Sequence, residues 1–190
     1  MKHYRLVFCI AMMLLLHGVK AQDIPPPNPS LSLNIVSGYS IVFNFDEIAE
    51  YKNGIMNAGQ SSFIRVGSIY DWKLQVNADQ NIFYGENDGT HQMPLDNVGL
   101  TILSTGTNLD DGTHIVNYAK TLPQALQSSE VTVLTKGSGS NRGWGIQNAF
   151  TMNWEMGTKR GNMNNQSLLE QMLAPDVYNV NIILTLSVYP

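Results

Sequence analysis

The sequence predicts an all-β protein, an immunoglobulin-like antiparallel β-sandwich of about 7–9 strands with one or two short helical turns. Apolar and polar residues alternate with a period of two from residue 31 onward, which is the pattern of half-buried strands. Segments rich in Gly, Asn, Asp and Ser separate the alternating runs. Helix signals are few and short, so an α/β fold is not expected.

The first segment of the chain has the pattern of a secretory signal peptide. Lys2 and Arg5 precede an apolar run over 6–16, and the small residue Ala21 ends the segment. The apolar run is too short to span a bilayer, so we expect cleavage before Gln22 and no membrane insertion afterwards.

These patterns divide the chain into a signal peptide (1–21), a proline-rich leader (22–30) and a single domain (31–190). The four prolines of the leader favour an extended backbone, which fits either a tether or a disordered segment without a role. Cleavage removes Cys9, the only cysteine, so the mature chain forms neither a disulfide nor a thiolate metal site. An exported domain of this size without disulfides is typical of a bacterial envelope.

The charge of the chain argues against nucleic acid and anionic membranes as partners. The full sequence carries a formal net charge of −4. The signal peptide contains Lys2, Arg5 and Lys20 and no acidic residue, so its removal lowers the net charge to −7. An acidic surface repels phosphate backbones and anionic headgroups.

Three runs alternate most regularly and are the firmest predicted strands: 72–76, 150–154 and 178–188. Five further strands are expected at 31–36, 40–45, 62–66, 98–103 and 131–135.

Loops and turns are expected between these strands. The segment 108–112 contains the Asp-Gly pair of tight hairpins, and 136–141 reads as a flexible loop. A short turn is expected over 168–173, capped by Asn165 or Ser167, and a second at 123–127.

The sequence predicts no catalytic residue, no cofactor and no metal ion. The mature chain offers only His91 and His114, neither in a nucleophile motif, and we expect them in a loop and a strand. Two distant histidines without cysteine do not make a zinc site. Glycoside hydrolysis needs only two carboxylates, but no pair stands out. The oxygen-rich loops 86–89 and 108–112 read either as ordinary turns or as calcium loops.

The tryptophans fall into two groups. Trp72 and Trp154 lie in phase with the apolar faces of their strands, so we expect them in the core. Trp144 instead lies between two glycines beside Arg142, in a segment too glycine-rich for the centre of a strand. Trp144 and Arg142 are therefore the candidate contacts for a glycan.

A short motif and the C-terminal strand suggest a family. Trp72-Lys73-Leu74 in the first half of the chain, and a Tyr-led strand over 178–188, resemble the WxL-like and fimbrial-subunit-like β-sandwich surface proteins. The resemblance covers most of residues 31–188 and implies Trp72 and Leu74 as motif residues. It also implies association with cell-wall glycan. A second Trp-x-Leu is usual near the C-terminus of WxL domains, and here 184–186 reads Leu-Thr-Leu.

The fimbrial resemblance also implies assembly by strand addition. In that arrangement an extended N-terminal segment of one subunit completes the sheet of the next through main-chain hydrogen bonds. Leu31, Leu33 and Ile35 alternate with polar residues after the leader and form the candidate donor strand.

We therefore expect a non-catalytic exported protein of the bacterial periplasm, cell surface or extracellular space that acts in adhesion or assembly, as a fimbrial-like subunit for example. The alternative is a secreted glycan-binding module. The expected partners are a protein, a second copy of the chain, or cell-wall or other glycan.

Overall fold

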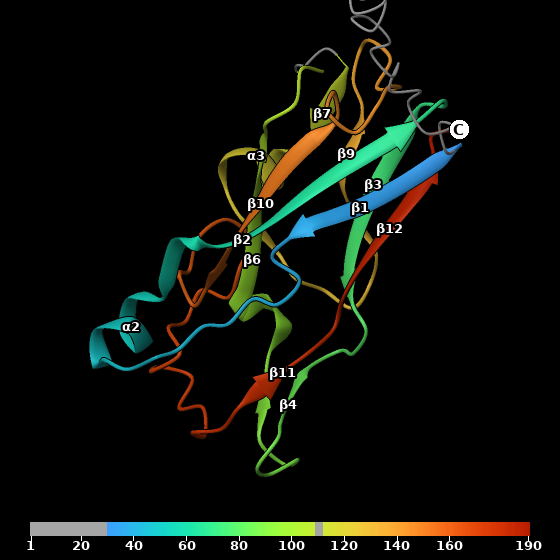
Figure 1. Cartoon of the computed structure of the whole chain (residues 1–190). Helices are drawn as coiled ribbons and strands as arrows, with labels where there is room; N and C mark the ends of the chain where they lie inside the picture. The colour runs from blue at the N-terminus through green and yellow to red at the C-terminus, as the bar shows by residue number, and fades with distance from the viewer. Residues whose placement is uncertain (1–29, 109–111) are drawn as a thin grey trace, which may run out of the picture.

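The computed structural model describes residues 30–108 and 112–190, except for the side chains of 57, 58 and 117. It confirms the all-β sandwich: two antiparallel sheets pack face to face, and a small third sheet extends one end (Figure 1). The predicted signal peptide, all but the last residue of the leader, and three residues of the 108–112 loop lie outside the described residues. No helix within the described ranges is long and apolar enough to cross a membrane.

The larger sheet has five strands, and every neighbouring pair is antiparallel. Their order across the sheet is β1 (Leu31–Ser37), β2 (Ile55–Ser68), β10 (Ala149–Met156), β6 (Val98–Ser104) and β8 (Gln124–Ala125).

The facing sheet has four strands in the order β12 (Ile182–Val188), β3 (Trp72–Ala78), β9 (Val131–Lys136) and β7 (Thr113–Ile115). The edge strands β1 and β12 of the two sheets lie near each other on one side of the sandwich (Figure 1). Among the described residues, neither strand is paired with another strand on that side.

The third sheet and the helices are small. The sheet has the order β11 (Tyr178–Asn179), β4 (Phe83–Gly85) and β5 (Gln92–Met93). The helices are α2 (Ile48–Asn53), α3 (Asn117–Thr121) and the 3-10 helix η1 (Leu95–Asn97). The strands outnumber the expected 7–9 because several contain only two or three residues.

The core lies between the two large sheets and follows the alternation read from the sequence. Trp72, Leu74 and Val76 of β3 are buried, and their neighbours in the strand are only partly buried. Across the core, the ring of Phe150 meets Trp72 edge-on, with 6.0 Å between ring centroids. The expected placement of Trp72 and Trp154 in the core is confirmed.

One expected strand is wrong: 40–45 forms no strand. Gly38 has a positive φ of 73° and turns the chain away from the sheet after β1. The N–H of Val42 then donates to the side chain of Gln60 instead of to a neighbouring strand. The apolar alternation had a different cause, because Ile41 and Phe43 pack half-buried against the core.

The expected strand over 178–188 is divided between two sheets. The chain breaks at Asn181, whose backbone N–H and side-chain amide both donate to the carboxylate of Asp79, at 3.1 and 2.7 Å. β11 therefore joins the small sheet and β12 the four-stranded sheet.

The two expected turns had different outcomes. The segment 123–127 contains β8, because Gln124 and Ala125 pair with the outer edge of β6. The turn after Ser167 is confirmed as a turn, and the Oγ of Ser167 accepts from the N–H of Glu170. The sequence reading missed α2, because its capping box has Glu47 at the N-cap, where Ser, Thr, Asp or Asn is the usual signal.

Candidate binding surface at the loop end

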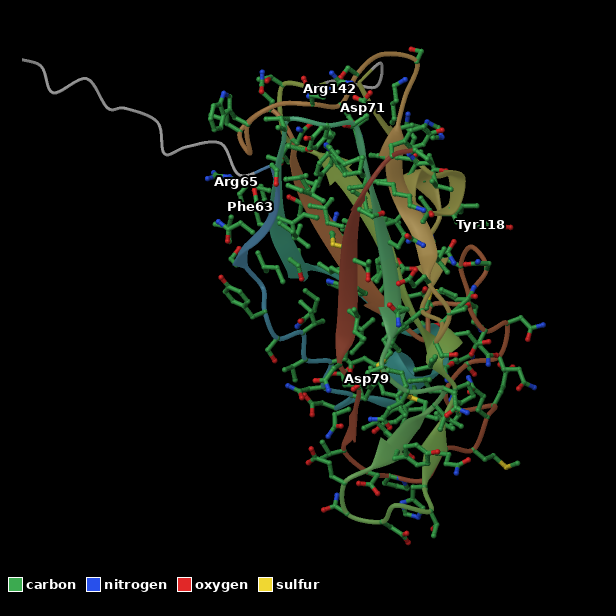
Figure 2. The ribbon with its side chains drawn as sticks, turned by 90° about the vertical axis from the view of Figure 1, so that its right-hand side faces the viewer. Phe63, Arg65, Asp71, Asp79, Tyr118 and Arg142 are labelled. Atoms are coloured by element: carbon green, nitrogen blue, oxygen red, sulfur yellow. The ribbon has the colours of Figure 1, made fainter. Side chains whose placement is uncertain are left out.

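Loops from different parts of the chain meet at the end of the sandwich opposite the small sheet (Figure 1). The β2–β3 turn contributes Asp71, and the β9–β10 loop (137–148) contributes Arg142 and Trp144. Figure 2 shows Asp71 and Arg142 together at this end, with Tyr118 and Asp79 further away. We call the surface formed by 69–71 and 137–148 the loop end.

A buried amide anchors the longer loop. The Asn141 side chain is fully buried, and its Oδ1 accepts from the backbone N–H of Trp72 at 3.0 Å. Its Nδ2 donates to the carbonyl of the same residue at 2.9 Å. The indole Nε1 of Trp72 also donates to the carbonyl of Asn141 at 2.7 Å. The amide thus takes the place of a strand neighbour for the first residue of β3.

A second buried amide ties the end of the loop to the first. The Nδ2 of Asn148 donates to the carbonyl of Asn141 at 2.9 Å, and its Oδ1 accepts from the side chain of Asn108. The carbonyl of Asn148 accepts from the N–H of Val66 in β2. Buried polar groups that are fully paired hold one geometry, so this glycine-rich loop is fixed at two points, Asn141 and Asn148.

The carboxylate of Asp71 orients the exposed middle of the loop. It accepts from the Oγ of Ser140 at 2.6 Å and the N–H of Asn141 at 3.2 Å, and Arg142 lies at 3.5 Å. The Ser140 hydrogen bond lowers the pKa of Asp71, burial opposes it, and the charge of Arg142 and the Asn141 N–H lower it further. The Arg142 side chain remains 59% exposed, so Asp71 orients it while leaving it accessible to a ligand.

Trp144 projects from this surface with 41% of the residue exposed. Its backbone N–H donates to the Oε1 of Gln147 at 2.7 Å. The preceding Gly143 has φ 144°, and a Cβ there would lie 2.2 Å from the same oxygen. Glycine at this position is therefore required by the turn that presents the indole ring.

More exposed side chains enlarge the surface around Trp144. Tyr70 and Ile146 are both exposed, at the β2–β3 turn and in the long loop. On β2, the exposed Arg65 lies beside Gly145 and stacks over the ring of Phe63 at 5.2 Å (Figure 2). The loop end thus combines aromatic and apolar area with the Arg142 guanidinium and the Asp71 carboxylate, and the Arg65 guanidinium lies beside it.

The other residues singled out from the sequence lie elsewhere. Trp72 and Leu74 are fully buried in β3, so the motif residues pack the core and are not open to a ligand. Leu31, Leu33 and Ile35 lie in β1, which pairs with β2 of its own chain.

A second polar cluster, which sequence reasoning missed, lies in the third sheet at the opposite end. The Asp176 carboxylate accepts from the N–H groups of Asn87 and Asp88 and from Nδ1 of His91, at 2.9, 3.0 and 2.9 Å. His91 lies in a loop and His114 in β7, as expected. The loop 86–89 was noticed for its oxygen atoms, but its partner Asp176 is far away in sequence.

Burial raises the pKa of the Asp176 carboxyl, but its hydrogen bonds outweigh that effect and hold the pKa well below the ordinary range. The largest of these contributions come from the N–H of Asn87 and the ring of His91. The cluster fixes the 86–91 loop. In the described ranges, no group of three or more His, Cys, Asp or Glu residues is placed to hold a metal ion.

Comparison with known proteins does not identify a family for the chain. No protein-family model matches the chain, and the search of curated proteins found no match. The geometry of the loop end is therefore the main guide to function.

Proposed function

We propose that the chain is a non-catalytic, exported envelope or cell-surface protein of a bacterium whose β-sandwich acts in adhesion, with the loop end as its contact surface. The observation that carries the proposal is the buried pair Asn141 and Asn148. Together they fix an otherwise flexible glycine-rich loop and leave Arg142 and Trp144 exposed.

The physical reason is the cost of ordering a loop on binding. A loop that is mobile before binding loses conformational entropy when it meets its partner, whereas a loop held in place has already lost it. Binding residues are often found on loops that a rigid scaffold positions. The two amides give the loop end this preorganisation, and the exposed Trp and Arg are the residue types most enriched in binding hot spots.

A secreted glycan-binding module is the second candidate, and Trp144 favours it. An exposed indole between glycines offers a flat apolar face that a sugar ring can cover. Arg142 in the same loop supplies a donor for hydroxyl groups, and Asp71 beside the loop supplies an acceptor. The resemblance to WxL-like surface proteins supports cell-wall glycan as the ligand to test first.

Trp144→Ala separates these candidates, with Tyr84→Ala as the matched control. Both residues are 41% exposed, but Tyr84 lies on β4 at the opposite end of the molecule (Figure 1). Retention of each variant is measured on immobilised cell-wall glycan and on intact bacterial and host cells.

Loss of glycan retention in Trp144→Ala alone, by about tenfold or more as for a hot spot of ~1.4 kcal/mol, identifies the glycan-binding module. Loss of cell binding alone, without glycan retention by any variant, identifies adhesion to a protein partner. Unchanged binding in both assays refutes the loop end as the contact surface.

A further inference from the structure

The outer face of the five-stranded sheet continues the surface of the loop end. Side chains of β2 alternate between the two faces of the sheet, so Ile64 and Val66 are buried in the core and Phe63 and Arg65 point outward. Figure 2 shows Phe63 and Arg65 on the side of β2 away from the facing sheet.

The loop that carries Trp144 lies against this same outer face. The backbone nitrogen of Gly145 is 3.9 Å from the position that a Cβ on Gly67 would take, and that position points outward from β2. The exposed indole of Trp144 is attached directly before Gly145. A ligand bound at Trp144 therefore lies next to the outer face of β2.

Arg65 is held in place on this face, but it has no charged partner. Its guanidinium stacks over the ring of Phe63 at 5.2 Å, and its Cβ, Cγ and Cδ carbons lie beside Gly145. Among the described residues Arg65 forms no ion pair, whereas Arg142 is paired with Asp71. The five N–H donors of a guanidinium have fixed directions. Arg65 thus presents oriented donors at the border of the loop end.

Short polar side chains continue the face beyond Arg65. The ladders of the sheet place these residues side by side on its outer face: Asn34 with Arg65, Phe63 with Thr151, and Asn153 with Thr101. We call this set the sheet face. Within the part of the chain that the structure describes, its amide and hydroxyl side chains form no hydrogen bond with other residues. They therefore offer both donors and acceptors to a ligand.

We infer that an extended glycan chain binds along the sheet face, from Trp144 across Arg65 and Phe63 to Asn153. The inference rests on the proposal that the loop end binds glycan, and it adds that the ligand is a chain of several sugars. From Gly67 to Phe63 the strand β2 extends about 13 Å, at about 3.3 Å per residue, which exceeds the length of one sugar ring.

The chemistry of the sheet face favours a glycan chain over a protein as the occupant. The centres of protein interfaces are enriched in aromatic residues, Met and Arg. Beyond Phe63 the sheet face instead carries hydroxyl and amide groups, which match sugar hydroxyls because both kinds of group donate and accept hydrogen bonds. Leu103 lies beside Thr151 with 59% exposed and supplies apolar area for the C–H groups of a sugar ring.

Arg65→Gln tests the sheet face while preserving the loop end. Glutamine keeps the Cβ, Cγ and Cδ positions that lie beside Gly145 and replaces the guanidinium with an uncharged amide. Lys73→Gln is the matched control, because it removes the same charge from the outer face of the four-stranded sheet. Asn153→Ala is a second, independent change further along the sheet face. Thermal unfolding of each variant checks that its fold is intact.

The probes are cell-wall glycan strands trimmed to defined lengths, from a disaccharide to long chains, with binding measured by titration calorimetry. The affinity of the wild type should rise by about tenfold or more from the disaccharide to the long chains. Arg65→Gln and Asn153→Ala should each remove much of this gain and leave disaccharide binding unchanged. Lys73→Gln should bind every length as the wild type does.

The same titrations separate failure of this inference from failure of the glycan candidate itself. Equal affinity for short and long chains, or a gain with length that neither Arg65→Gln nor Asn153→Ala reduces, overturns the inference. If Trp144→Ala still abolishes binding in that case, the loop end remains a glycan site. A gain that Lys73→Gln reduces as much as Arg65→Gln reflects net charge and also overturns the inference. A wild type that binds no glycan of any length overturns both.

Discussion

The side chain of Asn141 offers the sharpest test of how the loop end is built. Replacing it with alanine removes the two hydrogen bonds to the backbone of Trp72 and leaves a buried N–H and a buried C=O without partners. An unsatisfied buried group costs about 1–3 kcal/mol, so Asn141→Ala should lower the free energy of unfolding by roughly 2–6 kcal/mol. For a domain of this size, each kcal/mol corresponds to about 2–4 °C in Tm.

Urea unfolding followed by tryptophan fluorescence measures this loss, because Trp72 and Trp154 are buried in the folded chain. Ser140→Ala is the control. It removes two exposed hydrogen bonds, one to Asp71 and one from the N–H of Arg142, whose groups water can reach, so it should cost less than ~1.5 kcal/mol. A loss below about 1 kcal/mol for Asn141→Ala would refute the strand-neighbour role of the amide.

Three further predictions follow from other parts of the molecule. The pKa of Asp176 is lowered in the folded chain. The stability that the ionised carboxylate contributes should therefore be complete above its unfolded pKa of about 3.9 and be lost as the pH falls toward its folded pKa. Asp176→Asn should weaken this acid dependence, as measured by thermal unfolding between pH 6 and pH 2. The buried Glu155 carboxylate bonds the partly exposed Arg160 at 2.7 Å and also accepts from Thr158, so Arg160→Ala should cost about 1–3 kcal/mol in urea unfolding. Glu155→Gln in the same chain should recover part of this loss. The exported chain should begin at Gln22 by mass spectrometry of the intact protein, and a retained N-terminus would contradict the signal peptide.

The sequence was most informative where side chains alternate between core and solvent. β3 and β10 were located because each inward position carries a large apolar residue and each neighbour is polar or small. The same rule failed at 40–45, because an extended segment packed against the edge of a core shows the same alternation as a strand. The hydrophobic pattern indicates which side chains of a segment face the core. It does not indicate whether the backbone of that segment is hydrogen-bonded to a neighbouring strand.

The loop end was predicted in part. Trp144 and Arg142 were found because they lie two residues apart in a glycine-rich segment, which is a local signal. Asp71 and Asn141 were missed, since their hydrogen bonds join residues about 70 positions apart and neither belongs to a motif. The Asp176 cluster was missed for the same reason. Contacts between distant polar residues depend on the strand order, which the sequence pattern does not specify.

The direction of β12 determines where an addition to the C-terminus would emerge. This strand ends beside Asp71, so it points toward the loop end of its own chain. An affinity tag or a second domain fused after Pro190 would therefore lie next to the proposed contact surface. We expect such a fusion to weaken binding through Trp144, whereas a chain without it keeps the loop end accessible.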